Sequence, residues 1–126
     1  MNRIILFTVL AAFLLTACTS VIPPEKAVET YFEAINKKDA TQLSTITCKD
    51  WESEALMMLD SFTAVSTTLE SLTCQQTGTN SDGRVIVSCK GKLVASYNGE
   101  LQEFDLSAQE YIVDNSTGEW LVCGTN

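Results

Sequence analysis

Acid–base chemistry in this chain has to rely on carboxylates and tyrosines, because the sequence contains no histidine. It also lacks a glycine-rich phosphate loop and a recognisable nucleophile motif, which removes most familiar catalytic sets. We assign no catalytic residue. Glu110 is the one chemically unusual acid, since it falls in an apolar setting between Ala108 and Ile112. Carboxylates in such settings can bind a proton or a cation, and Tyr31 and Tyr97 are candidates to add hydroxyls to the same pocket.

The ordinary alternatives for these three residues stay open. A strand that flares near its end would let Glu110 reach solvent or pair with a helix group. Tyrosines on apolar faces are often core residues with a solvated tip.

Cys18 follows Leu-Thr-Ala at the end of an apolar run, residues 4–15, that begins just after Arg3. A run of this length is too short to span a bilayer comfortably. The pattern resembles the lipobox of bacterial lipoproteins, in which a peptidase cuts before the cysteine and the thiol carries a diacylglycerol. The resemblance implies that residues 1–17 are a signal peptide and that Cys18 is the lipidated N-terminus. An ordinary secretory signal with a chance cysteine is the alternative.

Assigning Cys18 to lipid leaves an even set of four from the five cysteines of the chain: Cys48, Cys74, Cys89 and Cys123. In an oxidising compartment such a set predicts two disulfide bonds, for which three pairings exist. A four-cysteine zinc site is the competing interpretation. It is disfavoured because the chain has no close Cys-x-x-Cys pair and no histidine. We expect no metal and no cofactor.

The charge balance restricts the partners. Removal of residues 1–17 leaves 109 residues and takes away Arg3, one of 8 basic residues, but none of the 16 acidic ones, so the formal charge becomes about −9. This charge excludes nucleic acid as a partner and disfavours binding to anionic lipid. Attachment to the membrane is therefore expected through the acyl chains on Cys18.

Helical periodicity marks the first half of the domain. Residues 25–38 predict an amphipathic helix, and Asp39 with Gln42 predicts a capping box for a short second helix. A third helix is expected over roughly 51–65. The apolar positions of the first helix share a fourfold spacing: Ala27, Val28, Tyr31, Phe32 and Ile35.

From about residue 69 the period changes to two, which predicts an antiparallel meander with strands near 69–77, 84–97 and 120–123. Asn98-Gly99 is a strong signal for a two-residue type I′ turn. The turn predicts that Tyr97 pairs with Glu100 and, counted further, that Val85 pairs with Ile112.

The same register places Glu110 on the apolar face, opposite Val87. In the preceding hairpin it places Cys74 opposite Cys89, a geometry that suits a disulfide, and leaves Cys48 to pair with Cys123.

Helices followed by an antiparallel sheet resemble the nuclear-transport-factor-2-like superfamily, and within it small lumazine-binding-like lipoprotein domains. The matching residues are the helix end Ala34–Asp39, the short helix after it and the late strand Gly118–Cys123. The resemblance implies an α+β fold in which N-terminal helices lie on the concave face of a curled sheet of about four strands. It also implies a conical pocket. Members include isomerases, cyclases and non-enzymatic binding domains, and no ketosteroid-isomerase residue matches here, so function is not carried over.

The expected organisation is a signal peptide (1–17), a lipidated tether (18–24) and a single domain (25–126), held on the cell membrane or outer membrane and facing the periplasm or exterior. Three functions stay open. The first is binding of a small molecule or an envelope partner, the second is an isomerase or cyclase that uses Glu110, and the third is a structural envelope lipoprotein with a filled core. A homodimer through the sheet is a further option.

Overall fold

Three α-helices open the described part of the computed structural model, which covers residues 22–126. They are α1 (Pro24–Lys37), α2 (Ala40–Thr45) and α3 (Glu52–Ser61), with a 3₁₀ turn, η1 (Lys49–Trp51), before α3. α1 begins with Pro24, which needs no backbone donor at a helix start, and ends at Lys38, whose φ of 58° closes the helix in the left-handed region. The first predicted helix is confirmed.

Asp39 caps α2, because its Oδ1 accepts a hydrogen bond from the Gln42 backbone N–H at 2.9 Å. The third helix is shorter than the predicted span of 51–65. Phe62 and Val65 form turns instead, with their N–H groups bonded three residues back, and the chain then enters the sheet.

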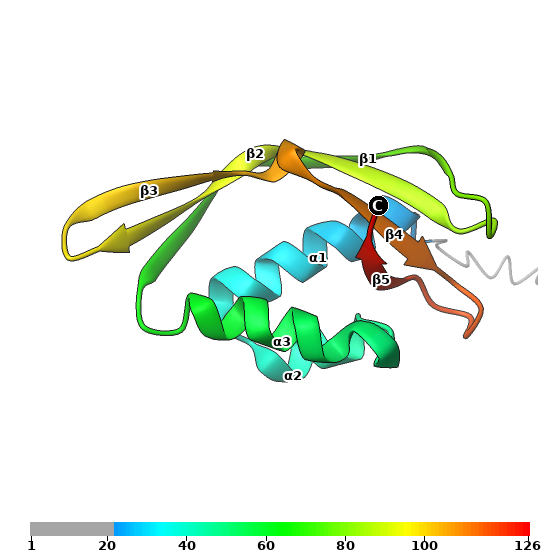
Figure 1. Ribbon diagram of the computed structural model, residues 1–126, viewed down its shortest axis with the longest axis horizontal. Coiled ribbons are helices and arrows are strands. Elements are labelled where there is room, and N and C mark those ends of the chain that lie inside the picture. The colour runs from blue at the N-terminus through cyan, green and yellow to red at the C-terminus, as the bar shows by residue number, and fades with distance from the viewer. Residues whose placement is uncertain (1–21) are drawn as a thin grey trace, which may run out of the picture.

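Five strands form one antiparallel sheet: β1 (Ser66–Thr79), β2 (Val85–Tyr97), β3 (Glu100–Asp105), β4 (Glu110–Asp114) and β5 (Leu121–Thr125). The order is β1-β2-β4-β5, and β3 pairs with β2 beside β4. The sheet curls over the helices, with α1 lying beneath it, and the β2–β3 hairpin reaches beyond the helical layer (Figure 1). The α+β class and the curled antiparallel sheet are confirmed. The sheet has five strands rather than about four.

The predicted register holds only for the hairpin itself. Asn98 and Gly99 have φ values of 50° and 86°, and the pairs run from Tyr97 with Glu100 to Lys92 with Asp105 as expected. A 3₁₀ turn, η2 (Leu106–Ala108), then interrupts the second strand of the hairpin.

β4 resumes pairing one residue out of the predicted register. Ser88 now faces Glu110, and Val85 faces Val113 instead of Ile112. Because side chains alternate between the two faces of a sheet, a shift of one residue turns every later side chain to the opposite face. The placement of Glu110 on the apolar face is therefore wrong, and Tyr111 takes that position, opposite Val87.

Two disulfide bonds are present, Cys74–Cys89 and Cys48–Cys123, instead of a four-cysteine zinc site. The first joins residues directly opposite each other on β1 and β2. The second joins the segment after α2 to β5, beside a hydrogen bond from the Cys48 N–H to the Val122 carbonyl at 2.9 Å. In the chain-entropy model a bridge that closes so long a loop contributes about 4 kcal/mol to stability.

The core lies between α1 and the sheet, where Val28, Ile35, Val87, Val113 and Val122 are among the fully buried side chains. Within residues 22–126, no helix has both the length and the apolar character required to cross a bilayer. Cys18 and residues 1–17 lie outside the described residues.

Candidate ligand-binding cavity

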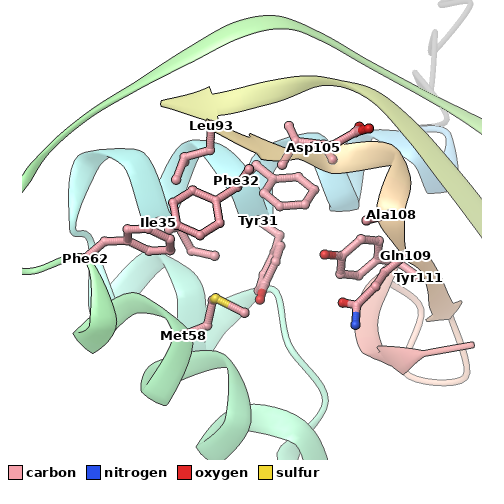
Figure 2. A pocket seen from close by; sticks show the side chains of 12 residues that line it. Tyr31, Phe32, Ile35, Met58, Phe62, Leu93, Asp105, Ala108, Gln109 and Tyr111 are labelled. Atoms are coloured by element: carbon pink, nitrogen blue, oxygen red, sulfur yellow. The ribbon is translucent and has the colours of Figure 1, made fainter. Parts of the chain in front are cut away.

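A cavity of about 300 Å³ separates the helices from the curled sheet at the end of the core. Figure 2 shows side chains from both layers projecting into it. Its walls are formed by Tyr31, Phe32, Ile35, Met58, Phe62, Leu93, Phe104, Asp105, Leu106, Ala108, Gln109 and Tyr111.

Each wall follows from local structure. The fourfold spacing on α1 places Tyr31 and Ile35 on one face, toward the sheet. Met58 and the residue after the end of α3, Phe62, close the helical side. η2 interrupts the β3–β4 edge, and the shifted register after it brings Tyr111 inward.

Packed aromatic rings fix the inner wall. The ring centroids of Tyr31 and Tyr111 are 5.8 Å apart, and Phe32 meets Tyr111 edge to face at 5.3 Å. Trp51 lies behind them, 5.5 Å from the Tyr31 ring. Tilted and edge-to-face contacts of this kind hold rings in defined orientations, so the positions of both tyrosine hydroxyls are set by the core.

The two hydroxyls are the distinctive polar groups of the cavity. Tyr31 is 1% exposed and Tyr111 is 7% exposed, yet among residues 22–126 no group forms a hydrogen bond with either hydroxyl. In Figure 2 the Tyr111 hydroxyl and the Gln109 amide both point toward the side of the cavity where Tyr31 lies. Both hydroxyl oxygens reach the open space of the cavity, whereas Asn36 Oδ1 is the one closed-off side-chain atom without a partner among residues 22–126. The two hydroxyls therefore offer hydrogen bonds that water or a ligand can take.

Burial keeps both tyrosines neutral. Loss of solvent raises the pKa of Tyr111 to about 12. Burial also raises the pKa of Tyr31, and the nearby Tyr111 adds to that rise. Both side chains keep the hydroxyl proton at neutral pH, as any tyrosine does, and burial extends this donor state to alkaline pH.

No positively charged side chain lines the cavity among residues 22–126. Asp105 is the one acid on its wall, and its carboxylate accepts hydrogen bonds from the Ser107 N–H at 2.9 Å and the Ser107 hydroxyl at 2.6 Å. These bonds lower the pKa of Asp105. Figure 2 shows its carboxylate turned away from the tyrosines.

Of the three pocket residues expected from the sequence, the structure places one on the cavity wall and two outside it. Tyr31 lines the cavity. Glu110 does not, because the register shift turns its carboxylate away, where it accepts a hydrogen bond from Asn126 Nδ2 at 3.2 Å. Tyr97 is not on the cavity wall either, since it lies at the far end of β2 and packs, partly buried, against the edge of the core.

Sequence reasoning missed Gln109 and Tyr111. The available signal was Asp105-Leu-Ser107, because an Asp that bonds to the backbone N–H two residues later starts a turn in place of a continuous strand. Comparison of the chain with family models, curated proteins and solved structures gives no match.

Proposed function

We propose that this chain is a lipid-anchored, extracytoplasmic domain that binds a small, largely apolar molecule in the cavity between α1, α3 and the sheet. One observation carries the proposal: an apolar cavity in which two tyrosine hydroxyls have no partner among the described residues. Apolar walls with a few convergent polar groups are typical of small-molecule sites.

The size of the cavity supports this proposal. Ligand sites commonly begin at roughly 300 Å³, and a cavity of roughly 150 Å³ binds benzene. A volume of about 300 Å³ thus has room for two fused rings, and the cavity opens to solvent beside the exposed Met58, which leaves space for a further ring at its mouth.

The arrangement also suits the nuclear-transport-factor-2-like resemblance, which implies helices in front of a curled sheet with a pocket between them. The structure has this order of elements and a cavity at this place. We propose membership of this superfamily on that basis. The lipobox resemblance of Cys18 supports an anchor on the cell membrane or outer membrane, with the domain on the periplasmic or exterior side.

The two alternative functions lose support. An isomerase or cyclase was expected to use Glu110 as its base, and Glu110 lies outside the cavity. A purely structural envelope protein was expected to have a core filled by its own side chains, and this core leaves about 300 Å³ open.

Two neighbouring methionines allow a matched test. Met58 lines the cavity and is 44% exposed, whereas Met57 is 67% exposed and does not line it. All the helices, strands and disulfides of the described residues lie between Pro24 and Thr125, so a chain of residues 22–126 keeps the whole described core. A cooperative thermal transition of this chain verifies that it folds.

The experiment titrates the chain with the uncharged fluorescent probe N-phenyl-1-naphthylamine. We expect saturable binding to the unchanged protein and to Met57→Trp, and a loss of at least tenfold in affinity for Met58→Trp, because the larger ring closes the mouth of the cavity. Melting temperatures of both variants check their folding. Absence of saturable binding to the unchanged protein, or equal losses in both variants, would contradict the proposal.

A further inference from the structure

The hydrogen-bonding groups of the cavity indicate the chemical class of its ligand, in addition to the ligand size that the cavity volume allows. Tyr31 and Tyr111 come from α1 and β4, far apart in the sequence, and their rings meet at 5.8 Å on one wall. The amide of Gln109 projects into the same region (Figure 2). A purely apolar ligand would displace water from these groups and leave them unpaired, which is costly.

We infer that the cavity binds an uncharged, flat molecule whose carbonyl oxygen accepts hydrogen bonds from Tyr31 and Tyr111. This inference rests on the proposed function and adds the chemical class of its ligand.

One acceptor oxygen has enough lone pairs for both hydroxyl donors. Each tyrosine has one O–H donor, and a carbonyl oxygen has two lone pairs, so a single atom can satisfy the two donors. A ligand that presents only an N–H donor would leave both hydroxyl protons without an acceptor. The neutral state of both tyrosines keeps these protons available.

The wall chemistry favours a ligand without charge. Among residues 22–126, no lysine or arginine lines the cavity. An anion would lose its hydration without gaining a cationic partner, which is unfavourable in an apolar site. A cation would find one acid on the wall, Asp105, and its carboxylate is already bonded to Ser107 and turned away.

The aromatic walls favour a flat ligand. Tyr31, Phe32 and Tyr111 form one side, and Phe62 and Phe104 meet edge to face at 5.3 Å on another. Planar rings pack against aromatic side chains in stacked or edge-to-face geometry. A fused bicyclic ketone therefore combines the volume, shape and acceptor that the cavity requires.

The test compares three probes that differ in one group: 2-acetylnaphthalene, its oxygen-free analogue 2-ethylnaphthalene, and the anion 2-naphthoate. Titration calorimetry on residues 22–126 measures each affinity. We expect the ketone to bind about tenfold more tightly than the hydrocarbon, since two hydrogen bonds to one oxygen are worth a factor of this order. We expect 2-naphthoate to bind at least tenfold more weakly than the ketone.

Substitutions then assign the donors. Tyr31→Phe and Tyr111→Phe should each lower the affinity for the ketone about fivefold and leave the hydrocarbon unchanged. Tyr97→Phe is the matched control, because Tyr97 lies outside the cavity, and it should change neither affinity. The infrared carbonyl band of the bound ketone should shift to lower frequency in the unchanged protein and move back in the two cavity variants.

The outcomes separate the two proposals. Failure of all three probes to bind contradicts the proposed function. Equal binding of the ketone and the hydrocarbon leaves a small-molecule cavity in place and overturns the carbonyl inference. Tightest binding of 2-naphthoate overturns the inference that the ligand is uncharged, and a ketone preference that survives both tyrosine substitutions overturns the assignment of the donors.

Discussion

At the residue scale, the two buried tyrosines make stability depend on alkaline pH. Tyr111 has a pKa of about 12 in the folded chain and about 10 when exposed, so the unfolded chain releases its proton first. The contribution of each neutral tyrosine is complete below pH 10 and is lost as the pH rises toward the folded pKa. The slope is at most about 1.4 kcal/mol per pH unit for each group.

We therefore expect the urea midpoint of residues 22–126 to fall between about pH 10 and pH 12. The double variant Tyr31→Phe, Tyr111→Phe should flatten this fall, because phenylalanine has no proton to release. The measurement is the urea midpoint at a series of pH values for both proteins. An equally steep fall in the double variant would show that other groups cause the alkaline loss.

A register shift of one residue moves Glu110 out of the cavity. It pairs with Ser88, and its carboxylate accepts a hydrogen bond from Asn126. We expect Glu110→Gln to change the free energy of unfolding by less than about 0.5 kcal/mol and to leave probe binding in the cavity unaltered. Titration of N-phenyl-1-naphthylamine checks the second point. A large loss of probe affinity would place Glu110 in the site after all.

The residues that could be predicted are those governed by local rules. The spacing of Tyr31 and Ile35 predicts the buried face of α1, and Asn98-Gly99 predicts the turn and the pairs as far as Lys92 with Asp105. Half of the cavity wall follows from these patterns.

The part of the wall from Leu106 to Tyr111 depends on a competition between a local turn and a continuous strand, which hydrophobic periodicity does not measure. The Asp105 carboxylate bonds to Ser107, and this local bond starts η2 in a segment where alternation predicts a continuous strand. The side chains of β4 take the face opposite to the predicted one, which exchanges Glu110 for Tyr111 in the apolar position. The disulfide pairs were unaffected because they depend on strands before η2 and on the end of the chain.

At the scale of elements, a bulge between β1 and β2 bends the sheet over the helices. Pairing is interrupted between Glu70 and Thr73, opposite Gly91. Gly91 has a φ of 101°, and Ser71 has a φ of 54°. A Cβ at position 91 would lie 2.5 Å from the Glu70 carbonyl oxygen and 2.6 Å from that of Ser71. Glycine is required here both for its backbone conformation and for the close approach of β1.

Gly91→Ala is therefore expected to lower the free energy of unfolding by about 2 kcal/mol or more, since left-handed strain alone costs about 1–3 kcal/mol. Gly78→Ala, in β1, is the matched control because a Cβ there meets no atom within 4 Å. It should be neutral or stabilising by up to about 1 kcal/mol. Urea denaturation of both variants measures the difference. Equal stability of the two variants would contradict the role assigned to Gly91.

At the scale of the whole molecule, the outer face of the sheet is built for solvent. Lys92 pairs with Glu103 at 2.6 Å and Glu70 at 3.5 Å across the bulge, and all of β3 is exposed. Exposed pairs such as these add little stability, but they keep the face polar. A homodimer through this face stays a prediction, and its charged centre is more polar than the core of a large permanent interface.

The acidic surface makes the proposed lipid anchor decisive for localisation. With a formal charge of about −9 after the proposed removal of residues 1–17, the domain would be repelled by anionic lipid, so we expect the acyl chains on Cys18 to hold it. In bacteria grown with labelled palmitate, we expect the full chain to carry the label and to sediment with membranes. Cys18→Ser should lose both properties, whereas Thr19→Ala, one residue away, should keep them. Label on the Cys18→Ser protein, or none on the unchanged protein, would contradict lipidation at Cys18. Membrane retention of the unlabelled variant counts against the lipid anchor only if its mass shows that residues 1–17 have been removed, because the uncut apolar run 4–15 would itself hold the protein on membranes.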